Sequence, residues 1–258
     1  MNIELIDETQ RYRFEKIQGI GTLNRNLENT LCAFYVHSGR VDLSISSQLG
    51  KDDIMLQAGQ GFLAGPGSTY TLNSSEDFFA VQSIAPVALG EDIIEIIDDG
   101  YKTREVPFLG HKLIDNPKRV DKPWGHELWI AWFKNHHVLK QIGMNAGNKS
   151  SLQLHENKLE TNYLVEGEAD VIDQFPIDTS LSEEEMKAAV KNVNWTDYTE
   201  RKKLGMYWTS KPGIVHRVIA ASDYTAYETS TPELDDVIRL SDVKKRTSGR
   251  INEEHRKK

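Results

Sequence analysis

Residues 147–171, GNKSSLQLHENKLETNYLVEGEADV, combine strand-like alternation and a Gly turn with three side chains able to bind a metal ion. Gln153 and His155 are two positions apart, so on a β-strand both side chains point to the same face. Glu160 follows at the start of the next predicted strand, and His216 arrives on a separate segment within the run KPGIVH. If this strand face lines a β-barrel, all four side chains enter one lumen.

The four side chains form a mixed nitrogen and oxygen donor set without a thiolate. Such a set suits Zn²⁺, Mn²⁺, Fe²⁺, Co²⁺ or Ni²⁺, and Zn²⁺ is the first expectation. Because a neutral Gln is a weak ligand, a barrel lumen leaves room for a substrate oxygen at the ion. His126, His136 and His137 are each predicted to be polar edge or core residues and not ligands. The sequence therefore predicts one divalent metal site.

Composition and charge narrow the classes of protein. With 258 residues, 38% of them apolar and 27% charged, the chain is predicted to be globular, with one large or two ordinary domains. The net charge of −8 argues against nonspecific nucleic-acid binding. No apolar run approaches the roughly 18 residues that span a membrane. The start, MNIELIDETQ, lacks the apolar core of a secretory signal, and the single Cys32 excludes an internal disulfide. We expect a cytoplasmic protein without nucleic-acid or membrane partners.

The chain contains an internal repeat. YVHSGRVDL (Tyr35–Leu43) aligns without gaps to YLVEGEADV (Tyr163–Val171), and PGSTY (Pro66–Tyr70) matches PGIVH (Pro212–His216). Each pair predicts a strand, a tight Gly turn, a second strand, and a Pro-Gly turn before another strand. The chain is therefore predicted to be mostly β, built from two copies of one small β-barrel.

The repeat assigns the metal to one copy. In the first copy the positions of Gln153, His155, Glu160 and His216 are taken by Arg25, Leu27, Cys32 and Tyr70. No ligand type survives, so only the C-terminal barrel is predicted to bind metal, and the N-terminal barrel is predicted to be structural or dimerising. The predicted boundaries are 1–96 for the first barrel, 97–118 for a linker rich in Gly and Pro, 119–246 for the second barrel, and 247–258 for a basic tail.

Helical patterns are few. One helix is predicted at Leu181–Val190, where Ser182 would be the N-cap and Glu185 would complete a capping box. A second candidate lies around Glu91–Asp99. The first helix belongs to an insertion, 173–203, for which a lid over the barrel mouth is one hypothesis.

Several motifs, in this order, carry a resemblance to a known family: KPWGHELW (Lys122–Trp129), Lys140, SLQLHENKLE (Ser151–Glu160), Gly167, PGIVHR (Pro212–Arg217) and DDVIRLSD (Asp235–Asp242). The segment 119–246 resembles the cupin domain of type II mannose-6-phosphate isomerases, which is often fused to a mannose-1-phosphate guanylyltransferase. The resemblance implies an all-β fold of two tandem cupin barrels, a bicupin with a few short helices. The chain departs from the family at Lys158, where the family has Arg, and at Thr161 and Asn162, where the family has His-Trp.

The resemblance also implies a reaction, the aldose–ketose isomerisation of a sugar phosphate. A metal ion would polarise the carbonyl or fix the enediol oxygens, and a base would move a proton between neighbouring carbons. Lys140 is the first candidate for this base and Glu228 the second. Arg239 is the first candidate for binding the phosphate. Lys158, at the barrel mouth, and Arg217 are further substrate-binding candidates, although Arg217 faces outward if His216 faces inward.

Two other functions stay open from the sequence. A cupin oxygenase would use Fe²⁺ in the same donor set, although Gln153 in place of a second strand His disfavours it. A non-catalytic carbohydrate-binding bicupin would keep the metal without the proton transfer. An exposed barrel sheet commonly dimerises, so a homodimer is a further expectation.

Overall fold

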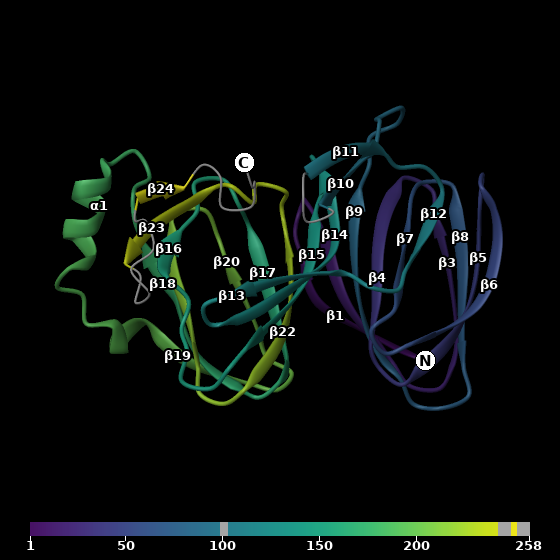
Figure 1. The fold of residues 1–258 in the computed structure, drawn as a ribbon, viewed down its shortest axis with the longest axis horizontal. Helices are drawn as coiled ribbons and strands as arrows, with labels where there is room; N and C mark the ends of the chain where they lie inside the picture. Colours follow the sequence, from purple (N-terminus) through teal and green to yellow (C-terminus); the bar gives the residue numbers. More distant parts are fainter. Residues whose placement is uncertain (99–102, 242–248, 252–258) are drawn as a thin grey trace. The chain divides into compact units, whose positions relative to one another are not determined.

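The structure, a computed structural model, describes residues 1–98, 103–241 and 249–251, and β-strands dominate it (Figure 1). The described part contains one α-helix, α1 (Glu183–Val190), and one short 3-10 helix, η1 (Trp195–Tyr198). The chain divides into two compact units, which are Met1–Lys118 with Trp129–Leu139, and Arg119–Leu128 with Lys140–Lys258. The predicted all-β fold is confirmed.

Most strands of unit 1 form two antiparallel sheets. Their strands are β1 (Asn2–Glu8), β2 (Arg13–Gln18), β3 (Gly21–Leu27), β4 (Thr30–Ser38), β5 (Arg40–Ser47), β6 (Gly50–Gln57), β7 (Gly61–Ala64), β8 (Ser68–Ser74), β9 (Phe79–Pro86) and β12 (His111–Ile114). The strand orders are β1-β2-β9-β4-β7-β12 and β3-β8-β5-β6. Apolar side chains of both sheets, among them Phe34, Phe62 and Tyr70, pack into one core. Alternation along the strands explains this, since every second side chain faces inward.

Unit 2 repeats the arrangement with later strands. These are β13 (Lys118–Lys122), β14 (Gly125–Lys134), β15 (Val138–Met144), β16 (Leu152–Leu154), β17 (Glu160–Glu166), β18 (Glu168–Pro176), β19 (Thr199–Lys203), β20 (Tyr207–Ser210), β21 (Ile214–Ala220), β22 (Tyr224–Ser230), β23 (Val237–Ser241) and β24 (Gly249–Ile251). Their orders are β14-β15-β22-β17-β20 and β19-β18-β21-β16-β23-β24. Strands β14 and β15 are each divided between the two units.

The predicted internal repeat is confirmed by topology and by register. The order β1-β2-β9-β4-β7 of unit 1 corresponds strand for strand to β14-β15-β22-β17-β20, and β3-β8-β5-β6 corresponds to β16-β21-β18-β19. Arg25 pairs with Tyr70 across β3 and β8, and Gln153 pairs with His216 across β16 and β21. The sequence alignment had matched these same two pairs.

The first Gly turn shows why the repeat keeps its glycines. Gly39 and Gly167 have φ angles of 75° and 78°, in the left-handed region that disfavours other residues. A Cβ atom at Gly39 would lie 2.6 Å from the carbonyl oxygen of Asp77, and one at Gly167 would lie 2.1 Å from that of Asp223. Both barrels therefore need a residue without a side chain at this turn.

Two predictions for the segment between the barrels require correction. The helix predicted around Glu91–Asp99 is wrong, because β10 (Ile94–Asp98) pairs with β11 (Thr103–Pro107) and with the end of β14. The residues predicted as a linker, 97–118, contain β11 and β12, and β12 joins a sheet of unit 1 by pairing with β7. Cross-strand pairing, which sequence periodicity does not show, decides both.

The predicted helix at Leu181–Val190 is confirmed as α1. Ser182 is its N-cap and forms a capping box with Glu185. Met186 and Val190 are its buried residues, and they pack with Leu154 and Ile238 in one cluster. Leu154 alternates with Gln153 on β16, so α1 covers the face of this sheet that is opposite to Gln153. The helix is therefore not the lid over the barrel mouth that the sequence suggested.

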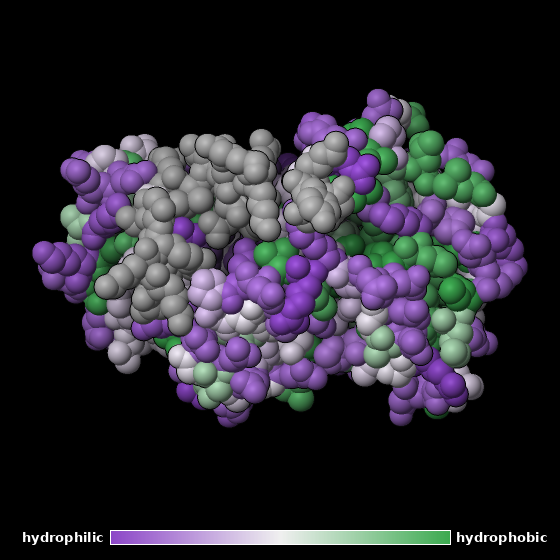
Figure 2. Space-filling model, in the orientation of Figure 1, coloured by the Kyte–Doolittle hydropathy of each residue, from purple (hydrophilic) through white to green (hydrophobic). Residues whose placement is uncertain are grey.

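The remaining expectations concern surfaces and termini. Of the basic tail predicted at 247–258, only β24 (Gly249–Ile251) is described, and the rest lies outside the described residues. None of the helices in the described chain has the length and apolar character needed to cross a bilayer. Figure 2 shows hydrophilic groups interspersed with hydrophobic ones on the visible face of each unit. The homodimer stays a prediction.

Candidate metal centre

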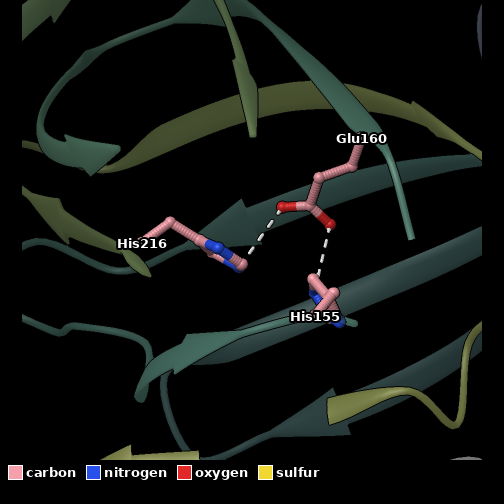
Figure 3. Close-up of side chains that lie close together, drawn as sticks. All are labelled: His155, Glu160 and His216. Atoms are coloured by element: carbon pink, nitrogen blue, oxygen red, sulfur yellow. Dashed lines mark ion pairs between the residues drawn. The ribbon is translucent and has the colours of Figure 1, made fainter. Parts of the chain in front are cut away.

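Three of the predicted ligands converge in unit 2 (Figure 3). His155 directly follows β16, Glu160 begins β17, and His216 lies on β21; all three are buried, and their ligand atoms lie within 4.8 Å of one another. The Nε2 atom of His155 is 3.7 Å from Glu160 Oε2, and the Nε2 atom of His216 is 3.6 Å from Glu160 Oε1. Two ligand atoms bound tetrahedrally at about 2.1 Å are about 3.4 Å apart, so the cluster has the dimensions of a metal site.

Gln153 completes the set from β16, opposite His216 in register. Its Nε2 atom lies 3.3 Å from His216 Nε2, and its Oε1 atom accepts a hydrogen bond of 2.5 Å from Ser151 Oγ. A metal ion binds the amide oxygen and not the amide nitrogen. Rotation of the Gln153 amide group by 180° exchanges the positions of Oε1 and Nε2 and would bring the oxygen toward His216. Gln153 is therefore at the centre, with its ligating atom turned toward Ser151.

Backbone carbonyls orient both imidazole rings. The Nδ1 atom of His155 contacts the carbonyl oxygen of Asp236, and the Nδ1 atom of His216 lies 3.1 Å from that of Ile214. Because a carbonyl only accepts, each Nδ1 carries a proton, and Nε2 is the nitrogen left to bind a metal. Metal-bound histidines in proteins are commonly held in this way.

The electrostatics of His155 also fit a ligand. Burial, and then the charges of Lys158 and His216, hold the pKa of His155 well below its ordinary value, so the ring is neutral. Its buried Nε2 atom makes no hydrogen bond within the described part of the chain. A buried acceptor of this kind costs free energy unless something binds it, and a divalent ion would do so.

Asp236 holds the loop between the ligands. Its carboxylate accepts hydrogen bonds from the backbone N–H groups of Glu156, Asn157 and Lys158, at 3.1 Å from Glu156 and 3.0 Å from Lys158. Together with its carbonyl contact to His155, this fixes the loop that joins β16 to β17. The sequence showed Asp236 only as part of the run DDVIRLSD, without this role.

Lys158, which the sequence suggested could reach the barrel mouth, is a buried residue of unit 2. Its Nζ atom donates to Glu160 and, at 2.9 Å, to Glu228 Oε1, and the residue is 5% exposed. Burial alone would lower the pKa of Lys158, but Glu160 and Glu228 together raise it, so the ammonium stays charged. The pKa of Glu160 is lowered, because Lys158 and His216 outweigh the effect of burial.

A cavity of about 100 Å³ opens beside these groups. The polar residues that line it are Lys122, Glu127, Lys140, Ser150, Ser151, Gln153, His155, Lys158, Glu160, Asn162, His216, Tyr224 and Glu228. Both base candidates, Lys140 and Glu228, are thus in the cavity wall. Lys140 Nζ lies 3.6 Å from Glu127 Oε2, and Lys122 Nζ lies 3.4 Å from Glu127 Oε1. The sequence missed Lys122 and Glu127, although both fall within the motif KPWGHELW.

The two arginines differ in position: Arg217 faces away from the metal-binding groups, whereas Arg239 lies on the sheet face of Gln153. Arg217 donates from Nε to the carbonyl oxygen of Ser150 and from Nη2 to that of Ser241, each at 3.1 Å. It follows His216 on the strand and so faces the other side of the sheet. Arg239 is buried on β23, paired in register with Gln153. Neither arginine contributes to the cavity wall.

The corresponding interior of unit 1 contains a hydrogen-bond network. The carboxylate of Glu15 accepts from Arg13 Nε at 2.5 Å, from Arg25 Nη2 at 2.9 Å and from Gln82 Nε2 at 3.1 Å. The hydroxyl of Tyr70 donates to Gln82 Oε1. Arg25 and Tyr70 hold the places of Gln153 and His216, so side chains occupy the region where unit 2 gathers its metal-binding groups.

The fold is that of two tandem cupin barrels, and the second barrel contains a cluster able to hold a metal. No family model and no curated protein sequence matches the chain. Solved structures match it across about nine tenths of its length. An oxalate decarboxylase of Lactobacillus farciminis has a TM-score of 0.59 and 11% identity, with 89% of this chain and 79% of the other covered.

Two further structures show the range of proteins with this fold. A Bacillus subtilis oxalate decarboxylase with Mn(II) centres has a TM-score of 0.59 and 11% identity, with 90% of this chain and 72% of the other covered. The vicilin of Corylus avellana has a TM-score of 0.58 and 10% identity, with 90% and 80% covered. At such identities the likeness shows the fold alone. None of these three is an isomerase.

Proposed function

We propose that the chain is a metal-dependent enzyme that moves a proton next to a carbonyl, an aldose–ketose isomerase of sugar phosphates. One observation carries the proposal. The side chains of His155, Glu160 and His216 line the same cavity as two buried pairs of opposite charge, Lys140 with Glu127 and Lys158 with Glu228. A metal ion beside groups able to carry a proton is the equipment that this reaction needs.

The donor set fits the implied metal, because the buried Nε2 atom of His155 makes no hydrogen bond to any residue that the structure describes. His155, Glu160 and His216 would hold the ion, with Gln153 as a fourth ligand after its amide turns. The bound ion would supply a Lewis acid for the carbonyl oxygen of the substrate. Nitrogen and oxygen donors suit Zn²⁺ and Mn²⁺ alike, so both ions belong in the test.

Lys140 is the proposed proton carrier. It is buried in the cavity wall, and its Nζ atom is 3.6 Å from Glu127 Oε2. Glu228, the second candidate, already accepts a hydrogen bond from the Lys158 ammonium at 2.9 Å. Because that oxygen of Glu228 is already engaged, whereas Lys140 keeps a longer contact with Glu127, Lys140 is preferred.

Formal charge supports an anionic substrate. Three lysines and three glutamates line the cavity, and their charges cancel. A divalent ion would leave the cavity with two positive charges. A phosphate monoester carries about −1.5 to −2 at pH 7, which balances them.

A non-catalytic bicupin that binds sugars is the second candidate, and one observation favours it. The Lys158 ammonium contacts the Glu160 carboxylate that a metal needs. A chain that had lost the reaction would tolerate such a contact. The oxygenase alternative receives no comparable support from the site.

The test combines metal analysis with isotope exchange. Purified protein is analysed for bound metal, loaded with Zn²⁺ or Mn²⁺, and incubated with hexose and pentose phosphates in D₂O. We expect one ion per chain and deuterium at C2 of one substrate. Exchange should disappear in Lys140→Met and His155→Gln and persist in Lys211→Met, an exposed lysine that matches the first change.

Three other outcomes would reject this function. Metal binding and thermal stabilisation by a sugar phosphate, without deuterium exchange, would identify the binding protein. Oxygen consumption would identify the oxygenase. A protein that binds no metal would remove the basis of all three.

A further inference from the structure

The ammonium of Lys158 lies between two carboxylates on neighbouring strands. Glu160 is on β17 and Glu228 is on β22, where Glu228 pairs in register with Asn162. Glu160 and Asn162 are two positions apart on β17, so Glu160 and Glu228 point to the same side of the sheet, into the cavity. Lys158 donates to both, and all three side chains are buried.

Two groups lie close to the same oxygen atom of Glu160, the ammonium of Lys158 and the imidazole of His155. Glu160 Oε2 accepts the hydrogen bond from Lys158 and also lies 3.7 Å from His155 Nε2. An ion that His155 and Glu160 hold through these two atoms lies between them. It would then be close to the ammonium, and two cations repel strongly where water is excluded.

The surroundings of Lys158 allow its ammonium to change partner. The backbone of its loop is anchored by the Asp236 carboxylate, so the loop itself stays in place. The Lys side chain is a flexible stem with a rotatable ammonium. Glu228 already accepts one of its hydrogen bonds, and that bond can persist when the bond to Glu160 is given up.

We propose that Lys158 is a built-in cation that competes with the metal for Glu160, and that Glu228 is the carboxylate to which it withdraws when the metal binds. The inference rests on the metal site proposed above. It adds that the affinity for metal is set by Lys158 and Glu228 as well as by the ligands. The same pair gives the centre a neutralised carboxylate when no ion is bound.

The test measures metal affinity by calorimetry, with Zn²⁺ and Mn²⁺ alone as the probes. Lys158→Met should bind at least about tenfold more tightly than the natural chain, because the competing charge is gone. Glu228→Gln should bind at least about fivefold more weakly, because the ammonium is left with Glu160 alone. Lys122→Met removes a lysine of the same cavity that pairs with Glu127, and should change affinity less than about threefold.

A double variant separates competition from a simple effect of charge. If Glu228 acts through Lys158, the change Glu228→Gln should weaken binding by less than about twofold when Lys158→Met is already present. If Glu228→Gln weakens metal binding as much in the Lys158→Met protein as in the natural chain, the inference is overturned. So would unchanged or weaker binding by a Lys158→Met protein whose circular dichroism and melting curve show that it is folded.

The remaining outcomes also decide the matter. If Lys158→Met does not fold, tighter or unchanged binding by Glu228→Gln overturns the inference and weaker binding supports it. Absence of binding by every variant overturns the metal site and the inference together. Metal binding with the expected affinities but without deuterium exchange would reject the isomerase and leave the inference standing.

Discussion

The Nδ1 atom of His155 contacts the backbone carbonyl oxygen of Asp236, a residue 81 positions later in the chain. This contact fixes which imidazole nitrogen carries the proton and turns the other nitrogen toward Glu160. The side chain of the same Asp236 holds the loop that follows His155. Asp236, directly before β23, is therefore part of the metal centre, although it supplies no ligand.

We predict that Asp236→Ala destabilises unit 2 by about 2–4 kcal/mol, because three backbone N–H groups lose a charged acceptor. The affinity for metal should fall by about tenfold, since the orientation of His155 is loosened. Urea unfolding and calorimetry measure the two effects. Asp236→Asn keeps one acceptor oxygen and should lie between the two proteins; equal stability of all three would contradict the role of Asp236.

Glu15→Ala should destabilise unit 1 by about 3–5 kcal/mol. The buried Glu15 carboxylate accepts from Arg13, Arg25 and Gln82, and its removal leaves the half-buried Arg25 guanidinium and the buried Gln82 amide short of a partner. Glu15→Gln retains the shape and should cost less. Metal affinity should not change in either variant, because the ligands belong to unit 2. A change in metal stoichiometry would show that unit 1 contributes to metal binding.

His137 should make unit 1 sensitive to acid. The ring is fully buried beside Phe133, and burial, followed by the charge of His136, lowers the pKa of His137 to about 3. Below a pH of about 6.5 the unfolded chain binds a proton that the folded chain refuses until about pH 3. Stability is therefore complete above about pH 6.5 and falls as the pH decreases, by about 2 kcal/mol at pH 5.

The variant His137→Phe isolates this effect. Neither ring nitrogen of His137 has a hydrogen-bond partner in the described residues, so phenylalanine removes two unsatisfied polar atoms. The free energy of unfolding of the variant should equal or exceed that of the natural protein at pH 8. The advantage of the variant should grow by about 2 kcal/mol at pH 5. A difference that is the same at both pH values would show that His137 does not titrate in this range.

Met186→Ala tests the position of α1. Met186 is fully buried against the sheet, so its truncation should cost about 2–4 kcal/mol of the stability of unit 2. Metal affinity and the KM for substrate should be unchanged, because the helix covers the face opposite to Gln153. Ala188→Ser, on the exposed side of the helix, should change stability by less than about 0.5 kcal/mol. A raised KM in Met186→Ala would restore the lid hypothesis.

Sequence patterns were sufficient for the features that depend on neighbouring residues. The spacing of Gln153 and His155 put both on one strand face. The alignment matched Gln153 and His216 to Arg25 and Tyr70, and each of these two pairs proves to be in register across its strands. The capping box of Ser182 and Glu185 was likewise predicted. Each of these follows from the period of a strand or a helix, or from self-similarity within the chain.

Patterns failed where distant segments compete for the same residues. The run Glu91–Asp99 looked helical, yet it pairs with β11 and β14. From the sequence, Lys158 is only a lysine at a position where the similar family has arginine. The folded barrel shows that its ammonium lies between Glu160 and Glu228. Glu127 and Lys122 had no periodic signal that set them apart from other charged residues.

The sequence by itself determined the β-rich repeat, the confinement of the ligand types to its second copy, and the donor set. Tertiary structure decided which nitrogen of His155 faces Glu160 and which carboxylates bind the ammonium of Lys158. It also decided which side of the sheet α1 covers. The physical reason is that alternation specifies the face on which a side chain lies. The partner that it meets there comes from strands tens of residues away, and only their pairing brings the two together.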